Sequence, residues 1–243
     1  MRHKLCFRFS IVVFLFVIDK RCLPTHKWRN QVNQKLTFLT LNGYFPDVVD
    51  GDKIPTGQFL NACQGIGEFV GFLGTAFLPV KNDVLGNVKK VRTKFDSNPE
   101  AFPFLQDLVE TDLREHNGSL GMASEGLLWL KRGLEFMLEL LLGMVKMHRE
   151  HDQSDSLHGL LSECYERTLK HHHGFISRQL FKVVLVAAPS RQSLIKTVAY
   201  GKDGYEEYCI QHMEAHLANF KHCVHSIVNF YHAKDLDRCY FSS

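Results

Sequence analysis

The sequence predicts an all-α fold in a single domain. Strand signals are scarce, while apolar residues recur at helical spacing along most of the chain after residue 30. The 243 residues, with 45% hydrophobic content, can bury one sizeable core. Neither a repeat period nor a low-complexity linker divides them, so we expect the helices to pack around one core.

Residues that break helices separate the expected helices. In chain order, the breakers are Pro79, Asn98-Pro99, Asn117-Gly118, the polar stretch His151–Ser156, Ala188-Pro189-Ser190 and Gly201–Gly204. The helices expected from the periodicity cover residues 56–75, 80–96, 99–115, 120–149, 157–188 and 204–234.

The charge balance argues against nucleic-acid binding. The chain has 29 basic and 26 acidic side chains and a net charge of +3, which is too small for a nucleic-acid binder on bulk electrostatics. A mild attraction to anionic membrane surfaces remains open. The seven cysteines are scattered, with no CxxC pair, which predicts reduced thiols in a cytoplasmic protein.

Residues 1–30 form an N-terminal extension that we expect to be separate from a domain at 31–243. Its start, Met1–Arg8, is basic, and an unbroken apolar run follows at Ile11–Ile18. The run is too short to span a bilayer. It has the length of a secretory h-region, but no small-x-small cleavage site follows it. The extension is therefore a signal peptide, which would mean secretory entry, or a gene-model extension, or a loosely attached helix.

A polar row lies on the expected helix 80–96. Asp83, Asn87 and Lys90 stand at i, i+4 and i+7, within an arc of about 60° at the border of the apolar stripe. A carboxylate accepts hydrogen bonds, an amide accepts and donates, and an ammonium donates. The row can therefore satisfy the mixed donors and acceptors of sugar hydroxyls. The alternative is a solvated face on which Asp83 pairs with the lysine.

Trp129 lies on the most apolar expected helix, 120–149, which should be central and largely buried. Gly126 and Gly133 share its face and leave room beside the indole. A tryptophan face suits the C–H face of a pyranose. The alternative is an ordinary core tryptophan.

His173 falls in the middle of an apolar stripe on the expected helix 157–188. The stripe consists of Tyr165, Leu169, Ile176, Leu180 and Val184. A histidine in such a stripe must have its ring nitrogens satisfied, so we expect a buried partner. That partner is either a protein group or a ligand, and a ceramide amide carbonyl could accept from a neutral imidazole N–H.

No catalytic motif accompanies these residues. HExxH, Gly-x-Ser-x-Gly and phosphate-binding glycine loops are all missing from the sequence. His212 and His216 stand at i, i+4, with His222, Cys223 and His225 on the same expected helix. This spacing permits a metal hypothesis, but no carboxylate stands at a third-ligand spacing. We therefore expect no enzymatic activity, no metal and no cofactor.

Four motifs follow one another along the chain. They are Pro79-Val80-Lys81-x-Asp83-x-x-Gly86-Asn87-Val88-x-Lys90, Leu128-Trp129-Leu130-Lys131-Arg132-Gly133-Leu134, His172-His173-Gly174 and Ala187-Ala188-Pro189. In these motifs and their spacing, the chain from about Phe69 to the C-terminus resembles the glycolipid transfer protein family. The resemblance implies a two-layer helical sandwich, with an apolar pocket for the ceramide chains and a surface site for the sugar.

The resemblance also implies roles for single residues in a headgroup site. Asp83, Asn87 and Lys90 match headgroup-binding positions. Trp129 matches the residue that stacks under the first sugar. His173 matches the histidine that holds the ceramide amide oxygen, and Asp83 would accept from the amide N–H.

Further matches concern the surroundings of that site. Tyr240 is expected to close the site from below. Phe175 stands where the best-known members have a tryptophan that touches the membrane. The positions that line the lipid-chain pocket fall on Phe77, Val80, Phe136, Leu169, Phe181 and Leu185.

The predicted function is the non-enzymatic transfer of a glycosphingolipid between membranes, with transient membrane contact. The cargo would be of the galactosylceramide, glucosylceramide or lactosylceramide type. Ceramide 1-phosphate is an alternative cargo, but family branches that bind it have a second cation where this chain has the neutral Asn87, which favours sugar over phosphate. A sphingolipid sensor or adaptor without net transport is the other alternative.

Overall fold

The computed structural model of the chain describes residues 44–199 and 201–237. All of these residues belong to one compact unit, Lys35–Ser243. The N-terminal extension 1–30 and Tyr240 lie outside the described residues, so the predictions made for them stay predictions.

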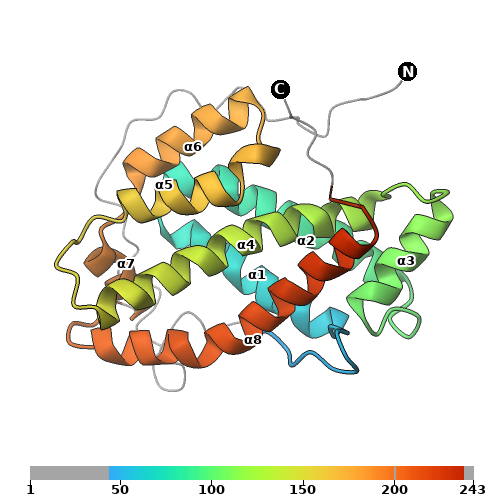
Figure 1. The fold of residues 1–243 in the computed structure, drawn as a ribbon, viewed down its shortest axis with the longest axis horizontal. Coiled ribbons are helices and arrows are strands. Elements are labelled where there is room, and N and C mark those ends of the chain that lie inside the picture. Colours follow the sequence, from blue (N-terminus) through green and yellow to red (C-terminus); the bar gives the residue numbers. More distant parts are fainter. Residues whose placement is uncertain (1–43, 200, 238–243) are drawn as a thin grey trace. The chain divides into compact units, whose positions relative to one another are not determined.

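The described residues are helical, as predicted (Figure 1). In chain order, the elements are α1 (Thr56–Phe72), η3 (Thr75–Phe77), α2 (Leu78–Ser97), α3 (Leu105–Glu115), α4 (Met122–Arg149), α5 (His158–Arg167), η4 (Lys170–His172), α6 (Phe175–Ala187), α7 (Arg191–Val198) and α8 (Glu206–Ala233). Isolated antiparallel bridges join Val49 to Lys53 and Pro55 to Phe104.

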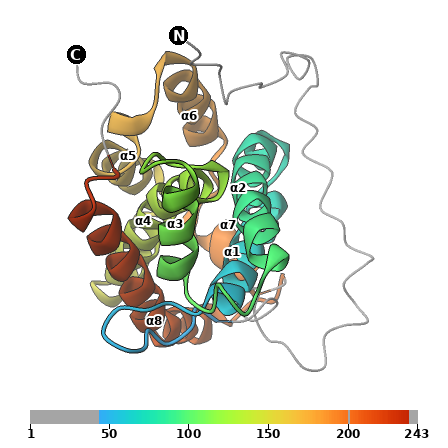
Figure 2. The ribbon, with the colours of Figure 1, turned by 90° about the vertical axis from the view of Figure 1, so that its right-hand side faces the viewer.

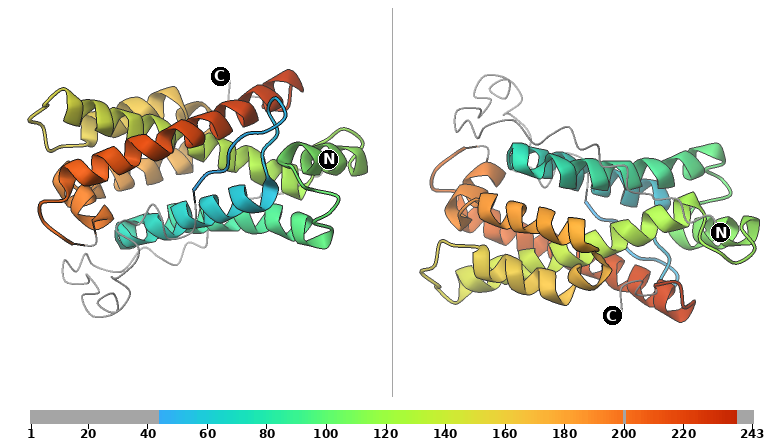
Figure 3. Two further views of the ribbon diagram at one scale, coloured as in Figure 1. Left: turned by 90° about the horizontal axis from the view of Figure 1, so that it is seen from below. Right: turned by 90° about the horizontal axis from the view of Figure 1, so that it is seen from above.

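Helix α4 is central to the arrangement. It packs against α2, α3, α5 and α8, and α1 packs along α2. Figures 2 and 3 show the α1–α2 pair on one side of α4. Helices α5 and α8 lie on the other side of α4. Helix α6 contacts α5 and η3, and α7 contacts α8. The arrangement confirms the predicted two-layer helical sandwich.

The prediction of one helix over 157–188 is wrong. The segment consists of α5, η4 and α6, because the backbone is extended at His173 (ψ 126°) and Gly174 (ψ 177°). Nε of Arg178 donates to the His173 carbonyl at 2.8 Å, which satisfies an acceptor that the break leaves open. The predicted apolar stripe is therefore divided between two helices, and the Ile176 side chain is 76% exposed.

The start of the third expected helix also differs. Helix α3 begins at Leu105 rather than at residue 99, because the preceding segment pairs with the chain in front of α1. The amide of Thr56 donates to the Pro103 carbonyl at 3.0 Å, and the amide of Leu105 donates to the Ile54 carbonyl at 2.9 Å. These long-range bonds compete with the local helix.

Helix α7 was not predicted; it lies between the breakers Ala188-Pro189-Ser190 and Gly201–Gly204. The Ser190 side chain caps it by accepting from the amide of Ser193. Its apolar residues Leu194, Ile195 and Val198 are buried against α4, α5 and α8. A helix of eight residues is marginal in isolation, so this tertiary packing is what stabilises it.

The core consists of neighbouring clusters of buried apolar side chains. The first and largest joins α1 to α4 and α8 and includes the fully buried Phe59 and Tyr231. A second joins α4, α5, α7 and α8. A third joins α1, η3 and α6 through Val70, Phe77 and Val184. Met137 of α4 packs against all three clusters, so they form a continuous core.

Candidate functional site

The predicted polar row on α2 exists as a hydrogen-bonded chain. Nζ of Lys90 donates to Oδ1 of Asn87 at 2.8 Å, and the Asn87 side chain hydrogen-bonds the Asp83 carboxylate. Asn87 is 4% exposed, while Asp83 is open to solvent. The middle of the row therefore lies against the core, and its end reaches the surface.

The Asp83 carboxylate sits where protein atoms partly desolvate it. This desolvation raises its pKa above the ordinary value, and Lys90 and the Asn87 amide oppose the rise. A carboxylate at such a border gains from a donor that replaces lost water, because burial penalises the charged form. The N–H or O–H group of a ligand could act as this donor.

Gly126 brings α4 close to the polar row. A Cβ atom at Gly126 would lie 3.1 Å from Cβ of Lys90 and 3.3 Å from the carbonyl oxygen of Asn87. Residues of α2 therefore fill the space next to Gly126. The prediction that Gly126 leaves room beside the Trp129 indole is wrong. A Cβ at Gly133 would meet nothing within 4 Å, in keeping with the expected room there. Trp129 lies one turn along α4 from the crossing at Gly126.

Trp129 is half-buried and makes two ring contacts. The Arg132 guanidinium lies over the indole at 4.6 Å from its centroid. The His173 ring stacks near the indole, with ring centroids 6.4 Å apart and an interplanar angle of 28°. The structure therefore places the predicted sugar platform beside the predicted amide-binding histidine.

His173 has a protein partner on one ring nitrogen. The Tyr165 hydroxyl lies 3.1 Å from Nδ1, and the Tyr165 ring stacks on Phe181 with centroids 3.6 Å apart. Burial, and then the nearby Arg132 and Arg178, lower the pKa of His173 to about 4. The ring is therefore neutral at pH 7. When the hydroxyl donates to Nδ1, the proton sits on Nε2, and that nitrogen can donate to a carbonyl.

A buried ionic cluster beside the site was missed by the sequence reasoning. Lys131 and Arg132 are 4% and 2% exposed, and Asp237 accepts hydrogen bonds from both. Burial, followed by Arg132, lowers the pKa of His172 to about 4, and its Nδ1 is buried with no hydrogen-bond partner shown. The only sequence signal was the Lys131-Arg132 pair inside an otherwise apolar helix.

The six apolar positions expected to line a lipid-chain pocket lie around α6. Phe77 and Val80 belong to the cluster that joins η3, α1 and α6. Phe136 meets Phe181 edge-on at 6.1 Å between centroids. Leu185 packs with Phe136 against the α4–α5–α7–α8 cluster, and Leu169 is half-buried at the start of η4. Their role as pocket lining remains a prediction.

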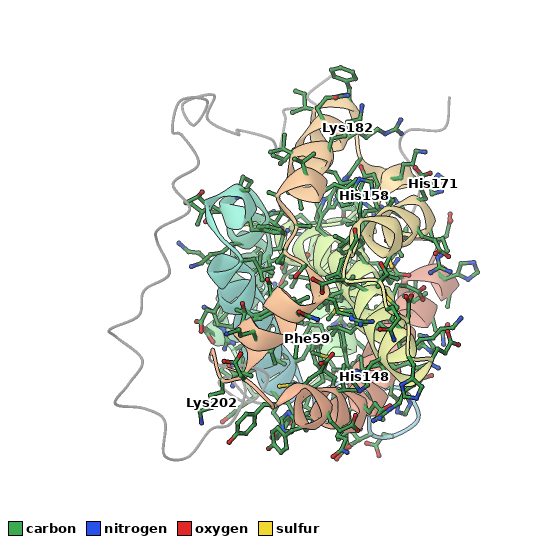
Figure 4. The ribbon with its side chains drawn as sticks, turned by 90° about the vertical axis from the view of Figure 1, so that its left-hand side faces the viewer. Phe59, His148, His158, His171, Lys182 and Lys202 are labelled. Atoms are coloured by element: carbon green, nitrogen blue, oxygen red, sulfur yellow. The ribbon has the colours of Figure 1, made fainter. Side chains whose placement is uncertain are left out.

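Helix α6 exposes an apolar face. Phe175 is 75% exposed, Ile176 76%, Val183 56% and Val186 85%. Figure 4 shows Lys182 of the same helix at the edge of the unit. Large exposed apolar side chains in one patch are typical of an interaction surface. No helix among the described residues is long and apolar enough to cross a membrane.

One group of acidic and histidine side chains has metal-ligand spacing, namely Asp112, Glu115 and His116 in the described part of the chain. Each already has a protein partner. Asp112 accepts from the amide and hydroxyl of Ser124, Glu115 pairs with Lys94, and Nδ1 of His116 contacts the Asp112 carbonyl. The group joins α3 to the start of α4.

The fold and the predicted site fit a helical lipid-binding protein: the polar row lies at the α2–α4 crossing, and one turn along α4 Trp129 lies near the neutral His173. A sequence model described as "Glycolipid transfer protein (GLTP)" matches residues 54–200. The chain belongs to the glycolipid transfer protein family.

Individual relatives agree with this assignment. The chain is 30% identical over 205 residues to the glycolipid transfer protein of Danio rerio, covering 83% of this chain and 98% of that one. It is 35% identical over 197 residues to pleckstrin homology domain-containing family A member 8 of Mus musculus, covering 78% of this chain and 36% of that one. The solved structure that shows how FAPP2 selects simple glycosphingolipids using the GLTP fold has a TM-score of 0.73 and 28% identity, covering 84% of this chain and 98% of that one.

Proposed function

We propose that this protein binds a glycosphingolipid and transfers it between membranes without chemical change. The observation that supports the proposal most is the close approach of α2 to α4 at Gly126, where Lys90 and Asn87 of the polar row lie against the helix turn that precedes Trp129. The crossing joins a set of sugar-binding donors and acceptors to an aromatic platform. The His173 ring lies near Trp129, with centroids 6.4 Å apart.

Each group has a distinct role in the proposed complex. The first sugar stacks on Trp129, and its hydroxyls exchange hydrogen bonds with Asn87 and Lys90. Nε2 of His173 donates to the amide carbonyl of the ceramide. Asp83 accepts from the amide N–H, which adds a donor to the one that Asn87 already gives its partly desolvated carboxylate. For Tyr240, which lies outside the described residues, the family resemblance predicts a role in closing the site.

Helix α6 is proposed to contact both the apolar chains of the lipid and the membrane surface. The ceramide chains enter between α6 and the layer of η3 and α4, lined by Phe77, Val80, Phe136, Leu169, Phe181 and Leu185. The exposed face of α6, with Phe175 at its start, contacts the membrane during uptake and release. A phenylalanine lacks the polar N–H of an interfacial tryptophan, so this contact is reversible. The proposed location is cytoplasmic.

The first test compares substitutions in the polar row by a vesicle-to-vesicle transfer assay with fluorescent galactosylceramide. Asp83→Val leaves the amide N–H and sugar hydroxyls unpaired, at about 1–3 kcal/mol per orphaned group. Transfer should fall at least about tenfold, since 1.4 kcal/mol is a factor of ten. Asp83→Asn keeps the shape and one acceptor and should be milder. Asp96→Val, at an exposed position on the same helix, is the matched control.

The cargo is tested by Asn87→Lys, assayed with galactosylceramide and with ceramide 1-phosphate. The change adds a cation to the row, so glycolipid transfer should fall and ceramide 1-phosphate binding should become detectable. Circular dichroism checks folding, because Asn87 is buried. If a folded Asp83→Val protein transferred galactosylceramide at the wild-type rate, the polar row would be only a solvated helix face, and the glycolipid proposal would lose its main support. Binding without faster exchange would identify a sensor or adaptor, and a wild-type preference for ceramide 1-phosphate would overturn the sugar assignment.

We also propose that residues 31–243 form the lipid-binding domain and that residues 1–30 are dispensable for folding. Deletion of residues 1–30 should leave cooperative thermal unfolding and transfer unchanged. Loss of the cooperative transition would contradict the proposed boundary. Recovery of the expressed full chain from the medium, cleaved near Cys22, would contradict the cytoplasmic location.

A further inference from the structure

Two histidines of α8 bring ring nitrogens together away from the proposed lipid site. His212 and His216 stand one turn apart, and their Nε2 atoms are 3.2 Å from each other. The ring centroids are 4.4 Å apart at an interplanar angle of 74°. Both side chains are half-buried. The proposed lipid function uses neither ring.

Aromatic neighbours hold both rings in place. Tyr44 stacks on His216 with centroids 3.8 Å apart and planes at 17°. Tyr208 lies nearly parallel to His212 with centroids 5.8 Å apart and planes at 18°. Such contacts restrict rotation of the imidazoles. The two Nε2 atoms therefore converge before any ligand arrives.

The separation of the nitrogens fits a shared metal ion. A zinc–imidazole bond is about 2.0–2.1 Å long, so a tetrahedral ion places two nitrogens about 3.3 Å apart, and a square-planar ion places cis nitrogens about 2.9 Å apart. The observed 3.2 Å lies close to the tetrahedral value. The sequence alone led us to expect no metal, but because the two Nε2 atoms converge in the structure, we propose that His212 and His216 form a two-histidine site for a divalent transition-metal ion, with zinc as the best fit.

The protonation of the pair is compatible with this role. Burial lowers the pKa of His212, and burial together with His212 lowers the pKa of His216. Both rings are neutral at pH 7, and in the metal-free pair one Nε2–H donates to the other Nε2. Metal binding requires that the donating ring move its proton to Nδ1 through exchange with water. Each ring then offers a lone pair on Nε2.

The coordination is expected to be open. Among the described residues, the only group of three or more ligand atoms within 4.8 Å is that of Asp112, Glu115 and His116. The His212–His216 site therefore has two protein ligands from the described chain, and water or an added ligand completes the coordination. An open site of this kind binds zinc reversibly.

The site is well separated from the lipid-binding machinery. Figures 1 and 4 show α8 along the edge of the unit opposite α6, with Lys182 of α6 at one end of the view and His148 near α8 at the other. Zinc binding and lipid transfer can therefore be tested independently. Failure of one proposal leaves the other untouched.

The test is a zinc titration of the full chain by isothermal titration calorimetry. His212→Asn and His216→Asn should each weaken zinc binding at this site at least about tenfold, because the second ligand of a chelating pair acts at high effective concentration. The matched control is the double variant His222→Asn/His225→Asn, which removes two exposed histidines further along α8. The control should bind zinc as the wild type does.

A second measurement follows the thermal unfolding midpoint with and without zinc. A ligand that binds only the folded state raises the midpoint, so zinc should stabilise the wild type and the control but neither single variant. Glycolipid transfer should be equal in all four proteins. If the single variants bind zinc like the wild type, or if the wild type binds none at millimolar zinc, then the two histidines share only a hydrogen bond and the proposal is wrong.

Discussion

Replacement of Asp237 by alanine should destabilise the protein far more than the loss of an ordinary surface ion pair. Its Oδ1 accepts from Nη2 and Nε of Arg132 at 2.6 Å and 3.1 Å, and its Oδ2 accepts from Nζ of Lys131. The side chains of Arg132 and Lys131 are 2% and 5% exposed. The carboxylate therefore compensates two cations that water scarcely reaches.

The loss of stability depends on which hydrogen-bond and ion-pair partners Lys131 and Arg132 retain in the Asp237→Ala variant. Lys131 retains an ion pair with Glu135 at 2.9 Å, whereas Arg132 loses both hydrogen bonds to Asp237. Breaking a buried pair costs about 3–5 kcal/mol, and because one cation keeps a partner, we expect about 3 kcal/mol. Lys234→Ala is the control, since its pair with Glu110 at 2.9 Å is exposed and should contribute at most about 1 kcal/mol.

Urea unfolding followed by circular dichroism measures both variants. Burial raises the pKa of Asp237, but its bonds to Lys131 and Arg132 outweigh burial, and the pKa lies below the ordinary 3.8. The stabilisation is then present above pH 3.8 and is lost as the pH falls through the folded-state pKa. The difference between wild type and Asp237→Ala should be constant near neutral pH and shrink in strong acid. A loss of under about 1 kcal/mol, equal to the control, would refute the reasoning.

Three further predictions concern the interface, the pH dependence and the helix crossing. Phe175→Trp should strengthen vesicle co-sedimentation without changing headgroup preference, and no gain would place Phe175 outside the interface. Below pH 6.5 His173 becomes protonated in the unfolded chain but stays neutral in the folded protein, where its pKa is about 4. The free energy of unfolding should therefore fall by up to about 2 kcal/mol between pH 7 and 5 because of this residue. In urea unfolding, His173→Gln should reduce this dependence of stability on pH. Gly126→Ala should destabilise the protein by about 1–3 kcal/mol, because the added Cβ would press on α2. Gly133→Ala should be neutral or stabilising by up to about 1 kcal/mol. Equal effects of the two variants in thermal unfolding would show that the helix crossing tolerates a methyl group.

The polar row shows which part of the site could be predicted from sequence. Residues at i, i+4 and i+7 share a helix face whatever surrounds the helix, so the row of Asp83, Asn87 and Lys90 followed from spacing, and the structure adds the hydrogen bonds within it. The apolar helix around Trp129 was likewise predicted as central, because its side chains cover most of the helix circumference.

The surroundings of His173 show where such reasoning fails. Helical periodicity continued across Gly174, so a single helix was predicted, but the chain is extended there and α6 starts a new direction. The stripe that suggested a buried histidine does not exist as one face. His173 is half-buried even so, because Tyr165, on the preceding helix, contacts its ring.

The helical class, the single core, the polar row and, through the motifs, the family are all predictable from the residues alone. These features depend on residue spacing within one helix, which backbone geometry converts directly into a face. Four features are visible only in the three-dimensional structure. They are the break at His173, helix α7, the close approach of α2 to α4 at Gly126 and the pairing of Asp237 with Arg132, 105 residues away. Each of these depends on contacts between distant segments, and the free energy of such contacts is comparable to or larger than local helix propensity.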